Sequence, residues 1–369
     1  MLKGIKSALL LTLAMTIASV SYAFAEGKTY NIAIIRWDAG DIFFNGVQYG
    51  EEEGMKAIEA ATGDKINFKV VAANDAPKQI NGLRALMAQG IDGVSLVPWK
   101  GPSMVQLLKE LKSEGIPVVT HNMTVPGQEA PFVAFANQDA GRLAAEAIEA
   151  ELIRGRGENW GANGGVIMIL RGNITNSFDY ERDDGYRSVF DKMLAKFPKV
   201  EIIERADLDY AAEPARKAVE DAITRYGIEN ILAIGSVDGT MAVGGAIPAI
   251  KTAGGNVKAN TPNRIAVTSI DCSKPELDAI TNGDLTHCSE QPAIAEGILV
   301  QNLLYDMMSN GTVTPSNGAE AMDGAEGQPW APVEKLTRDD ISGPWYKTQA
   351  FAVPGQVPVD GDGHWGLVN

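Results

Sequence analysis

Residues Gly165 to Tyr186 read GVIMILRGNITNSFDYERDDGY, and this stretch predicts the fold. Its first six residues are an apolar run, which indicates a buried strand. The polar loop that follows leads into a segment with Val189, Phe190, Met193 and Leu194 at helical spacing. Open α/β sheets bind ligands at the carboxyl ends of their strands, in loops of this kind. The stretch therefore predicts an α/β fold with a binding loop between Leu170 and the helix.

Arg182 is the candidate binding residue of this stretch, three positions before Gly185. A guanidinium is a rigid, planar set of donors that suits an oxygen-rich ligand. The alternative is a surface ion pair with Asp179, Asp183 or Asp184, and such pairs are common and weak. The loop alone leaves both interpretations open.

The same strand–loop–helix unit recurs along the chain. Before residue 165, apolar runs predict strands at 29–35, 68–72, 94–97 and 116–120; after it, they predict strands at 200–204, 231–235, 265–270 and 285–289. Helical periods lie between them, as in residues 79–89. Strict alternation of strands and helices indicates parallel sheets covered by helices on both faces. The length suits two domains, so we expect two doubly wound lobes.

The first 25 residues have the pattern of a secretory signal. Lys3 and Lys6 precede a short apolar segment, and Ala23-Phe24-Ala25 has small residues at the positions that a signal peptidase reads. The apolar segment is shorter than the ~20 residues that span a bilayer. We expect cleavage near Glu26 and a soluble, exported mature chain.

Composition excludes several classes of protein. The formal charge of −15 argues against nucleic acid or an anionic membrane surface as a partner. Three scattered histidines, His121, His287 and His364, offer neither zinc-site spacing nor a catalytic base beside a nucleophile, so we expect no metal, no cofactor and no enzyme. Cys272 and Cys288 either form a disulfide, as exported proteins allow, or are two small buried side chains.

Several short motifs resemble the ribose-binding group of periplasmic solute-binding proteins, the type I binding proteins of ABC sugar importers. The resemblance covers most of the mature chain, to about Ile341. Its motifs are Phe43-Phe44 after the first strand, Gly90-Ile91-Asp92-Gly93 before Val97-Pro98, Gly115-Ile116-Pro117-Val118-Val119, Asn137 to Gly141, Arg182 with Gly185, and Leu336 to Ile341.

The resemblance implies a site between two lobes. Arg182 would bind sugar oxygens, and Asn122, Asp238, Asp271 and Gln291 fall at further ligand positions of the family. Phe43 and Phe44 would cover the apolar face of a sugar. Residues of other strand-exit loops complete the candidate set: Trp37, Asp41, Trp99 and Lys100.

The chain departs from the ribose-binding pattern at several of these positions. Lys100 and Asn122 stand where ribose binders carry Asp, Asp238 where Asn is commoner, and Met123 where a second Arg is common. Leu208 stands where an aromatic residue of the second lobe often stacks on the sugar, with Tyr210 close by. The resemblance therefore implies an altered pocket, and not ribose as the solute.

We expect a monomeric periplasmic protein that closes around a monosaccharide or polyol and delivers it to an ABC permease. The alternative is a periplasmic sensor protein of the same fold that presents its ligand to a receptor. The expected division is 1–25 as signal, 26–122 plus about 292–320 as the first lobe, and 123–291 plus about 321–369 as the second. The hinge is expected near 122–124, at 291–292, and within 310–332.

Overall fold

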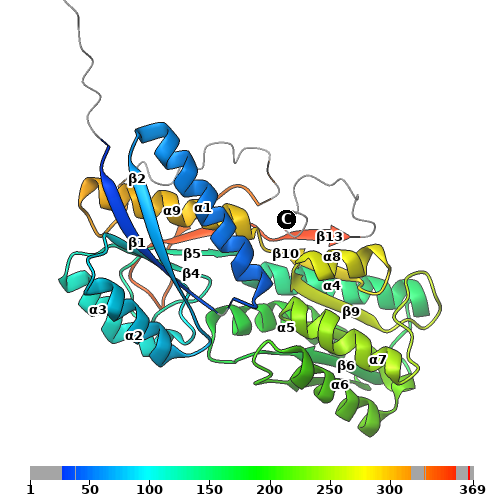
Figure 1. Cartoon of the computed structure of the whole chain (residues 1–369). Coiled ribbons are helices and arrows are strands. Elements are labelled where there is room, and N and C mark those ends of the chain that lie inside the picture. The colour runs from blue at the N-terminus through cyan, green and yellow to red at the C-terminus, as the bar shows by residue number, and fades with distance from the viewer. Residues whose placement is uncertain (1–26, 38, 317–327, 329, 355–364, 366–369) are drawn as a thin grey trace, which may run out of the picture.

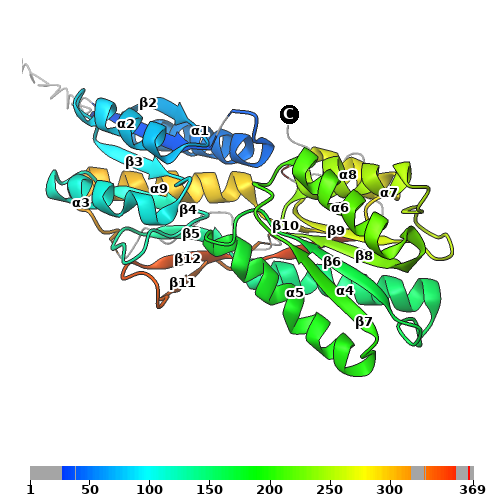
Figure 2. The same cartoon turned by 90° about the horizontal axis from the view of Figure 1, so that it is seen from below.

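The computed structural model describes residues 27–37, 39–316, 328, 330–354 and 365, so the predicted signal segment lies outside the described residues. Two sheets with their helices lie side by side and form two lobes (Figures 1 and 2). Among the described residues, no helix has both the length and the apolar character needed to cross a bilayer.

The first sheet has seven strands in the order β11-β12-β5-β4-β3-β1-β2. Its strands are β1 (Thr29–Arg36), β2 (Lys65–Ala72), β3 (Gly93–Leu96), β4 (Val118–His121), β5 (Phe132–Phe135), β11 (Glu334–Leu336) and β12 (Trp345–Thr348). All pair in parallel except β11, which runs antiparallel to β12.

Helices cover both faces of the first sheet because successive side chains of its strands point to opposite sides. In β1, Ile32 and Ile34 pack with α1 (Ile42–Thr62) and α9 (Ala293–Asn310). Ala33 and Ile35 pack with α2 (Ala76–Met87) and α3 (Val105–Ser113), which follows the short helix η1 (Gly101–Met104). A strand that is apolar on both faces is the mark of a covered parallel sheet.

The second sheet has six strands in the order β13-β10-β9-β8-β6-β7, and only β13 is antiparallel. Its strands are β6 (Gly165–Leu170), β7 (Val200–Arg205), β8 (Ile231–Ser236), β9 (Ala266–Asp271), β10 (His287–Glu290) and β13 (Phe351–Pro354). The helical segments of this lobe are α4 (Asn137–Arg156), α5 (Ser177–Lys196), α6 (Ala212–Tyr226), η2 (Ile228–Asn230), η3 (Met241–Ala246), α7 (Ile247–Thr252) and α8 (Lys274–Thr281).

The predicted α/β class and the predicted pair of mostly parallel sheets are confirmed, but the strand pairing corrects the expected boundaries. The expected division puts residues 123–135 and 334–348 in the second lobe, whereas β5, β11 and β12 pair in the first sheet. The chain therefore passes between the sheets after Phe135, at residues 291–292, and at residues 349–350. The expected hinge position at 291–292 coincides with a passage, the one at 122–124 lies between β4 and β5 of the first sheet, and most of the expected range 310–332 lies outside the described residues.

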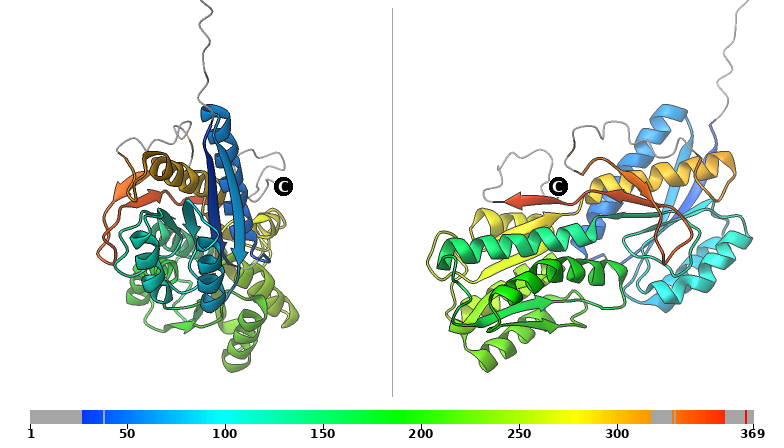
Figure 3. Two further views of the ribbon diagram at one scale, coloured as in Figure 1. Left: turned by 60° about the vertical axis from the view of Figure 1, so that its left-hand side comes forward. Right: turned by 180° about the vertical axis from the view of Figure 1, so that it is seen from behind.

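The segment 345–354 contributes a strand to each of the two sheets. Its β12 pairs with β5 of the first sheet, and its β13 pairs with β10 of the second. Figure 3 shows these strands, coloured orange to red, running along one side of both lobes. Cys272 and Cys288 form a disulfide between the end of β9 and the neighbouring β10, with their Cα atoms 5.5 Å apart. Of the two interpretations of these cysteines, the structure has the disulfide.

Candidate ligand-binding site

The acidic side chains around Arg182 are held by another arginine. Arg171, at the end of β6, forms ion pairs with Asp179 at 2.7 Å and with Asp183 at 3.2 Å. Asp179 also accepts the backbone N–H of Gly172, which closes the loop before α5. Arg171 therefore holds two of the three acids that the surface-pair interpretation gave to Arg182, and that interpretation is wrong because the Arg182 side chain is buried.

Arg182 is instead 1% exposed and points toward the boundary between the sheets. Its Nε donates to Asn137 Oδ1 at 2.9 Å, Nη1 to the Val237 carbonyl at 2.6 Å, and Nη2 to Gln291 Oε1 at 2.7 Å. Its Nη1 also lies 3.2 Å from Asp271 Oδ1. A buried guanidinium is stable only when its donors are satisfied in this way.

Two glycines let the helices that carry these residues approach closely. A Cβ on Gly141 of α4 would lie 2.0 Å from the Arg182 carbonyl oxygen, and a Cβ on Gly185 of α5 would lie 2.1 Å from that of Gln138. Both distances are impossible contacts, so the crossing of α4 and α5 requires glycine at these positions. The crossing places Asn137, at the start of α4, beside Arg182.

Three carboxylates belong to the same cluster. Burial raises the pKa of Asp271 to about 6, against the opposing attraction of Arg182, and nearby Asp41 raises it further. Burial also raises the pKa of Asp238 well above its ordinary value, with further contributions from Asp271 and Asp41. Asp238 caps the segment that begins η3 by accepting the Met241 N–H, and Asp41 caps α1 by accepting the Phe44 N–H. These caps hold the carboxylates at the ends of strands β8 and β1.

An amide network connects Arg182 to the first lobe. Gln291 Nε2 donates to Asn122 Oδ1 at 3.2 Å and to Glu296 Oε2 at 2.7 Å. Glu296 also contacts His121 Nε2 at 2.9 Å and accepts Thr348 Oγ1 at 2.8 Å. All five side chains are buried. His121, the last residue of β4, is thus a buried member of this network.

Aromatic rings from both lobes meet beside this cluster. Trp37 contacts Phe44 and Trp99 of its own lobe, with ring centroids 5.1 and 4.6 Å apart. Across the boundary it contacts Tyr210 at 5.4 Å and Phe178 at 6.2 Å. Phe178 also lies 4.8 Å from the Arg182 guanidinium. The lobes are therefore in contact, an arrangement that we call closed.

The remaining predicted residues have different positions. Phe43 is buried and contacts both Phe44 and His121. Trp99 is half-buried at the edge of the aromatic cluster, whereas the Lys100 side chain is exposed. Lys100 thus stays outside the cluster around Arg182, because it lies at the N-cap of η1, on the solvent side.

Two rings of the aromatic cluster, those of Phe178 and Tyr210, were not among the predicted site residues. Phe178 lies four residues before Arg182, so the two share a face of α5. This spacing in the sequence could have identified Phe178 as a site residue. Tyr210 lies in a loop where Asp207, Asp209 and Tyr210 itself all have positive φ. Gly172 makes room for the Tyr210 ring, since a Cβ there would lie 2.0 Å from it. No local pattern in the sequence indicates such a loop.

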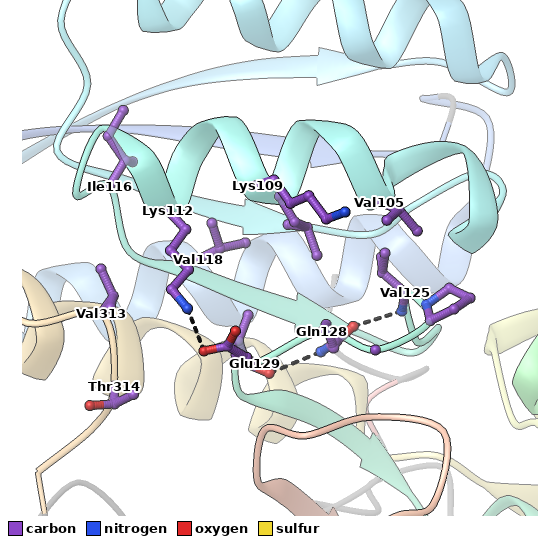
Figure 4. Close-up of a pocket in the computed structure, with 14 residues that line it drawn as sticks. Val105, Lys109, Lys112, Ile116, Val118, Val125, Gln128, Glu129, Val313 and Thr314 are labelled. Carbon is purple, nitrogen blue, oxygen red and sulfur yellow. Dashed lines mark hydrogen bonds and ion pairs between the residues drawn. The ribbon is translucent and has the colours of Figure 1, made fainter.

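A separate groove of about 140 Å³ lies on the α3 and β4 side of the first lobe (Figure 4). Its lining is largely apolar and includes Val105, Val118 and Val125. Lys112 at its rim is paired with Glu129 at 2.5 Å. This lining differs from the converging guanidinium, carboxylate and amide groups around Arg182, which are the kind that orient a small polar ligand.

The family model described as "Periplasmic binding protein domain" matches residues 32–312. The chain belongs to this family. It is 25% identical to a xylitol-binding protein of Mycolicibacterium smegmatis, over 77% of this chain and 74% of that protein. It is 27% identical to the D-xylose-binding periplasmic protein of Haemophilus influenzae, over 78% of this chain and 80% of that protein.

The fold also matches a solved structure, the ABC transporter periplasmic solute binding protein of Actinobacillus succinogenes with bound D-allose. The TM-score is 0.66 at 15% identity, over 88% of this chain and 97% of that one. The periplasmic binding protein match ends before β11, β12 and β13, so these three strands lie outside the part that the family model describes.

Proposed function

We propose that this periplasmic binding protein takes up a small carbohydrate or polyol between its two lobes and delivers it to the permease of an ABC importer. The observation that carries the proposal is the placement of Arg182. It lies buried at the lobe boundary, between carboxylates, amides and aromatic rings that come from both sheets.

The chemistry of these groups suits a ligand with several hydroxyls. A hydroxyl both donates and accepts, and hydrogen bonds to charged partners are worth about 1.5–3 kcal/mol net. Arg182 would donate to ligand oxygens, while Asp238 and Asp271 would accept from ligand hydroxyls. Trp37, Phe178 and Tyr210 would cover the C–H face of the ligand. Asn122 and Gln291 supply amide groups that do both.

Lobe closure is the proposed mechanism. Of the described residues, we assign 27–37, 39–135, 293–316 and 330–348 to the first lobe and 137–290 and 351–354 to the second, so that the three passages between them form the hinge. In this structure Arg182 donates to Asn137, the Val237 carbonyl and Gln291. A ligand must replace some of these bonds, and it favours closure only by contacts made in the closed state.

We further infer that residues 1–25 are removed on export and that the mature protein is a periplasmic monomer without enzymatic activity. Intact-mass measurement of the protein from a periplasmic extract tests the cleavage near Glu26. Light scattering during gel filtration tests the monomer. A mass that retains the first 25 residues, or a dimer at micromolar concentration, would contradict these inferences.

Calorimetric titration tests the binding function. Purified protein is titrated with a panel of pentoses, hexoses and polyols, and the denatured protein is analysed by mass spectrometry for a retained solute. We expect at least one member of the panel to bind with micromolar or tighter affinity. Failure of the whole panel, together with a retained solute of another class, would overturn the proposed ligand class.

A further inference from the structure

Trp365 contacts the second lobe from a position beyond β13, outside the residues that the family model matches. Its indole Nε1 donates to the carbonyl oxygen of Asp271 at 2.8 Å. Its backbone N–H donates to Glu290 Oε1 at 3.2 Å. Asp271 and Glu290 are the last residues of β9 and β10. Trp365 is therefore hydrogen-bonded to the carboxyl ends of these strands, where the candidate site lies.

The same indole packs against the first lobe. Its ring lies edge-on to Phe43 of α1, with centroids 5.6 Å apart. A Cβ on Gly46 of α1 would lie 2.8 Å from the indole Cε3, so a larger residue there would have to displace the indole. Only 6% of Trp365 is exposed. The indole therefore fills a space that is bounded by both lobes.

Asp271 has an unusual backbone that needs support from its surroundings. It has φ of 119° and the following Cys272 has φ of 59°, both in the region that favours glycine. Such residues cost roughly 1–3 kcal/mol and persist where neighbouring groups hold them. The Trp365 indole holds the Asp271 carbonyl, and the disulfide to Cys288 holds the next residue. Asp271 in turn contacts Arg182 through its carboxylate.

We propose that Trp365 is a positioning residue for ligand recognition and a clamp on the closed state. Its indole N–H keeps Asp271 in the conformation that places the carboxylate beside Arg182. Its ring keeps Phe43 of the first lobe against the end of β9 in the second. The positioning role rests on the proposed function of Arg182 and Asp271, whereas the clamp requires only the closed arrangement.

Two substitutions separate the two roles. Trp365→Phe keeps an aromatic ring beside Phe43 and removes the indole donor, whereas Trp365→Ala removes both. Trp160→Phe is the matched control, because Trp160 is a buried tryptophan that packs on Phe197 within the second lobe. Its Nε1 has no hydrogen-bond partner among the described residues, so the control loses no such bond.

Affinity is measured by calorimetry with D-xylose and xylitol, and lobe opening by small-angle X-ray scattering of the ligand-free protein. We expect Trp365→Phe to weaken binding about tenfold, as for a lost buried hydrogen bond. Its effect should vanish in an Asp271→Asn background if Trp365 acts through that carboxylate. Trp365→Ala should also increase the radius of gyration of the ligand-free protein, while Trp160→Phe should change neither quantity.

Distinct outcomes overturn the two parts. If Trp365→Phe lowers the melting temperature but binds like wild type, or if its effect persists undiminished in the Asp271→Asn background, the positioning role is wrong. If Trp365→Ala leaves the radius of gyration unchanged, the clamp is wrong. If neither probe binds the wild-type protein, these probes give no support to the proposed function and the positioning role falls with them, while the scattering comparison still decides the clamp.

Discussion

Arg182 Nη2 donates to Gln291 Oε1 over 2.7 Å, which joins α5 of the second lobe to the passage between β10 and α9. Gln291 in turn donates to Glu296, in the first turn of α9. The candidate ligand residue is thus one hydrogen bond from a passage between the sheets and two hydrogen bonds from α9. A ligand that takes over the Arg182 donor would alter the bonding of the hinge directly.

Replacing Arg182 should abolish ligand binding. Arg182→Ala removes the donors to Asn137, Val237 and Gln291 and leaves the Asp271 carboxylate buried without its cation, so we expect at least a hundredfold loss of affinity. Arg182→Lys should also bind weakly, because an ammonium cannot reproduce the planar set of donors. Calorimetry with the best ligand of the panel measures both.

Arg154→Ala is the control for these substitutions, since Arg154 is a half-exposed arginine paired with Glu151 on α4. Surface pairs of this kind are worth about 0–1 kcal/mol, so its binding should equal that of wild type. Normal affinity in Arg182→Ala would show that the site lies elsewhere.

Glu296 should set the orientation of the Gln291 amide. An ionised carboxylate only accepts hydrogen bonds, so it faces the NH₂ group of Gln291 and leaves Oε1 toward Arg182. Glu296→Gln presents an amide that can turn either way, and we expect about tenfold weaker binding together with a less uniform closed state. Titration and tryptophan fluorescence, with Trp37 at the lobe contact, measure the two effects.

Glu51→Gln is the matched control for Glu296→Gln. Glu51 is also a buried helix carboxyl, hydrogen-bonded to Ser95 in the face of the first sheet that α1 covers. The Glu51→Gln substitution makes the same chemical change away from the hinge, so the ligand affinity of this variant should match that of wild type. Equal losses in the two variants would contradict a specific role for Glu296.

Stability should fall as the pH rises from 4.5 to about 7, and Glu51 should cause part of the fall. Burial raises the pKa of Glu51 from 4.5 to about 7. Between these values the folded state holds a proton that the unfolded state has lost, so the free energy of unfolding decreases with rising pH. A raised pKa of this size corresponds to up to about 3 kcal/mol across the window.

Chemical denaturation at pH 4 and pH 8 measures this dependence. Glu51→Gln should be nearly as stable as wild type at pH 4. It should be more stable than wild type at pH 8, because glutamine carries no charge into the buried site. A wild-type stability that rises from pH 5 to pH 8, with no relative gain for Glu51→Gln, would refute the assignment.

Removing the disulfide should destabilise the second lobe. Cys272 and Cys288 are 16 residues apart, and a closed loop of about that length contributes roughly 3 kcal/mol by restricting the unfolded chain. We expect a Cys272→Ser, Cys288→Ser double variant to lose about that much in denaturant titration. The same measurement on the wild-type protein under reducing conditions should agree, and an unchanged midpoint in both would contradict the expectation.

The fold of both lobes was predictable because its signals are local. Apolar runs such as Gly165–Leu170 indicate buried strands, and the loops after them contain the candidate ligand residues. Arg182 was predictable as a candidate for the same reason. The short strands β5, β11, β12 and β13 were missed, since segments of three or four residues acquire their structure from the strands beside them.

The sequence by itself determined the class of fold, the positions of most strands, and the loops in which the candidate site residues occur, because strand and helix periods depend on near neighbours. Only the tertiary structure decided that Arg171 takes the acids Asp179 and Asp183 and leaves Arg182 to Gln291 and Asp271. It also decided the place of Trp365 between Phe43 and Asp271. The contacts of Arg182 and of Trp365 join residues far apart in the chain, so they follow from packing within the second lobe and between the two lobes, and not from any local pattern.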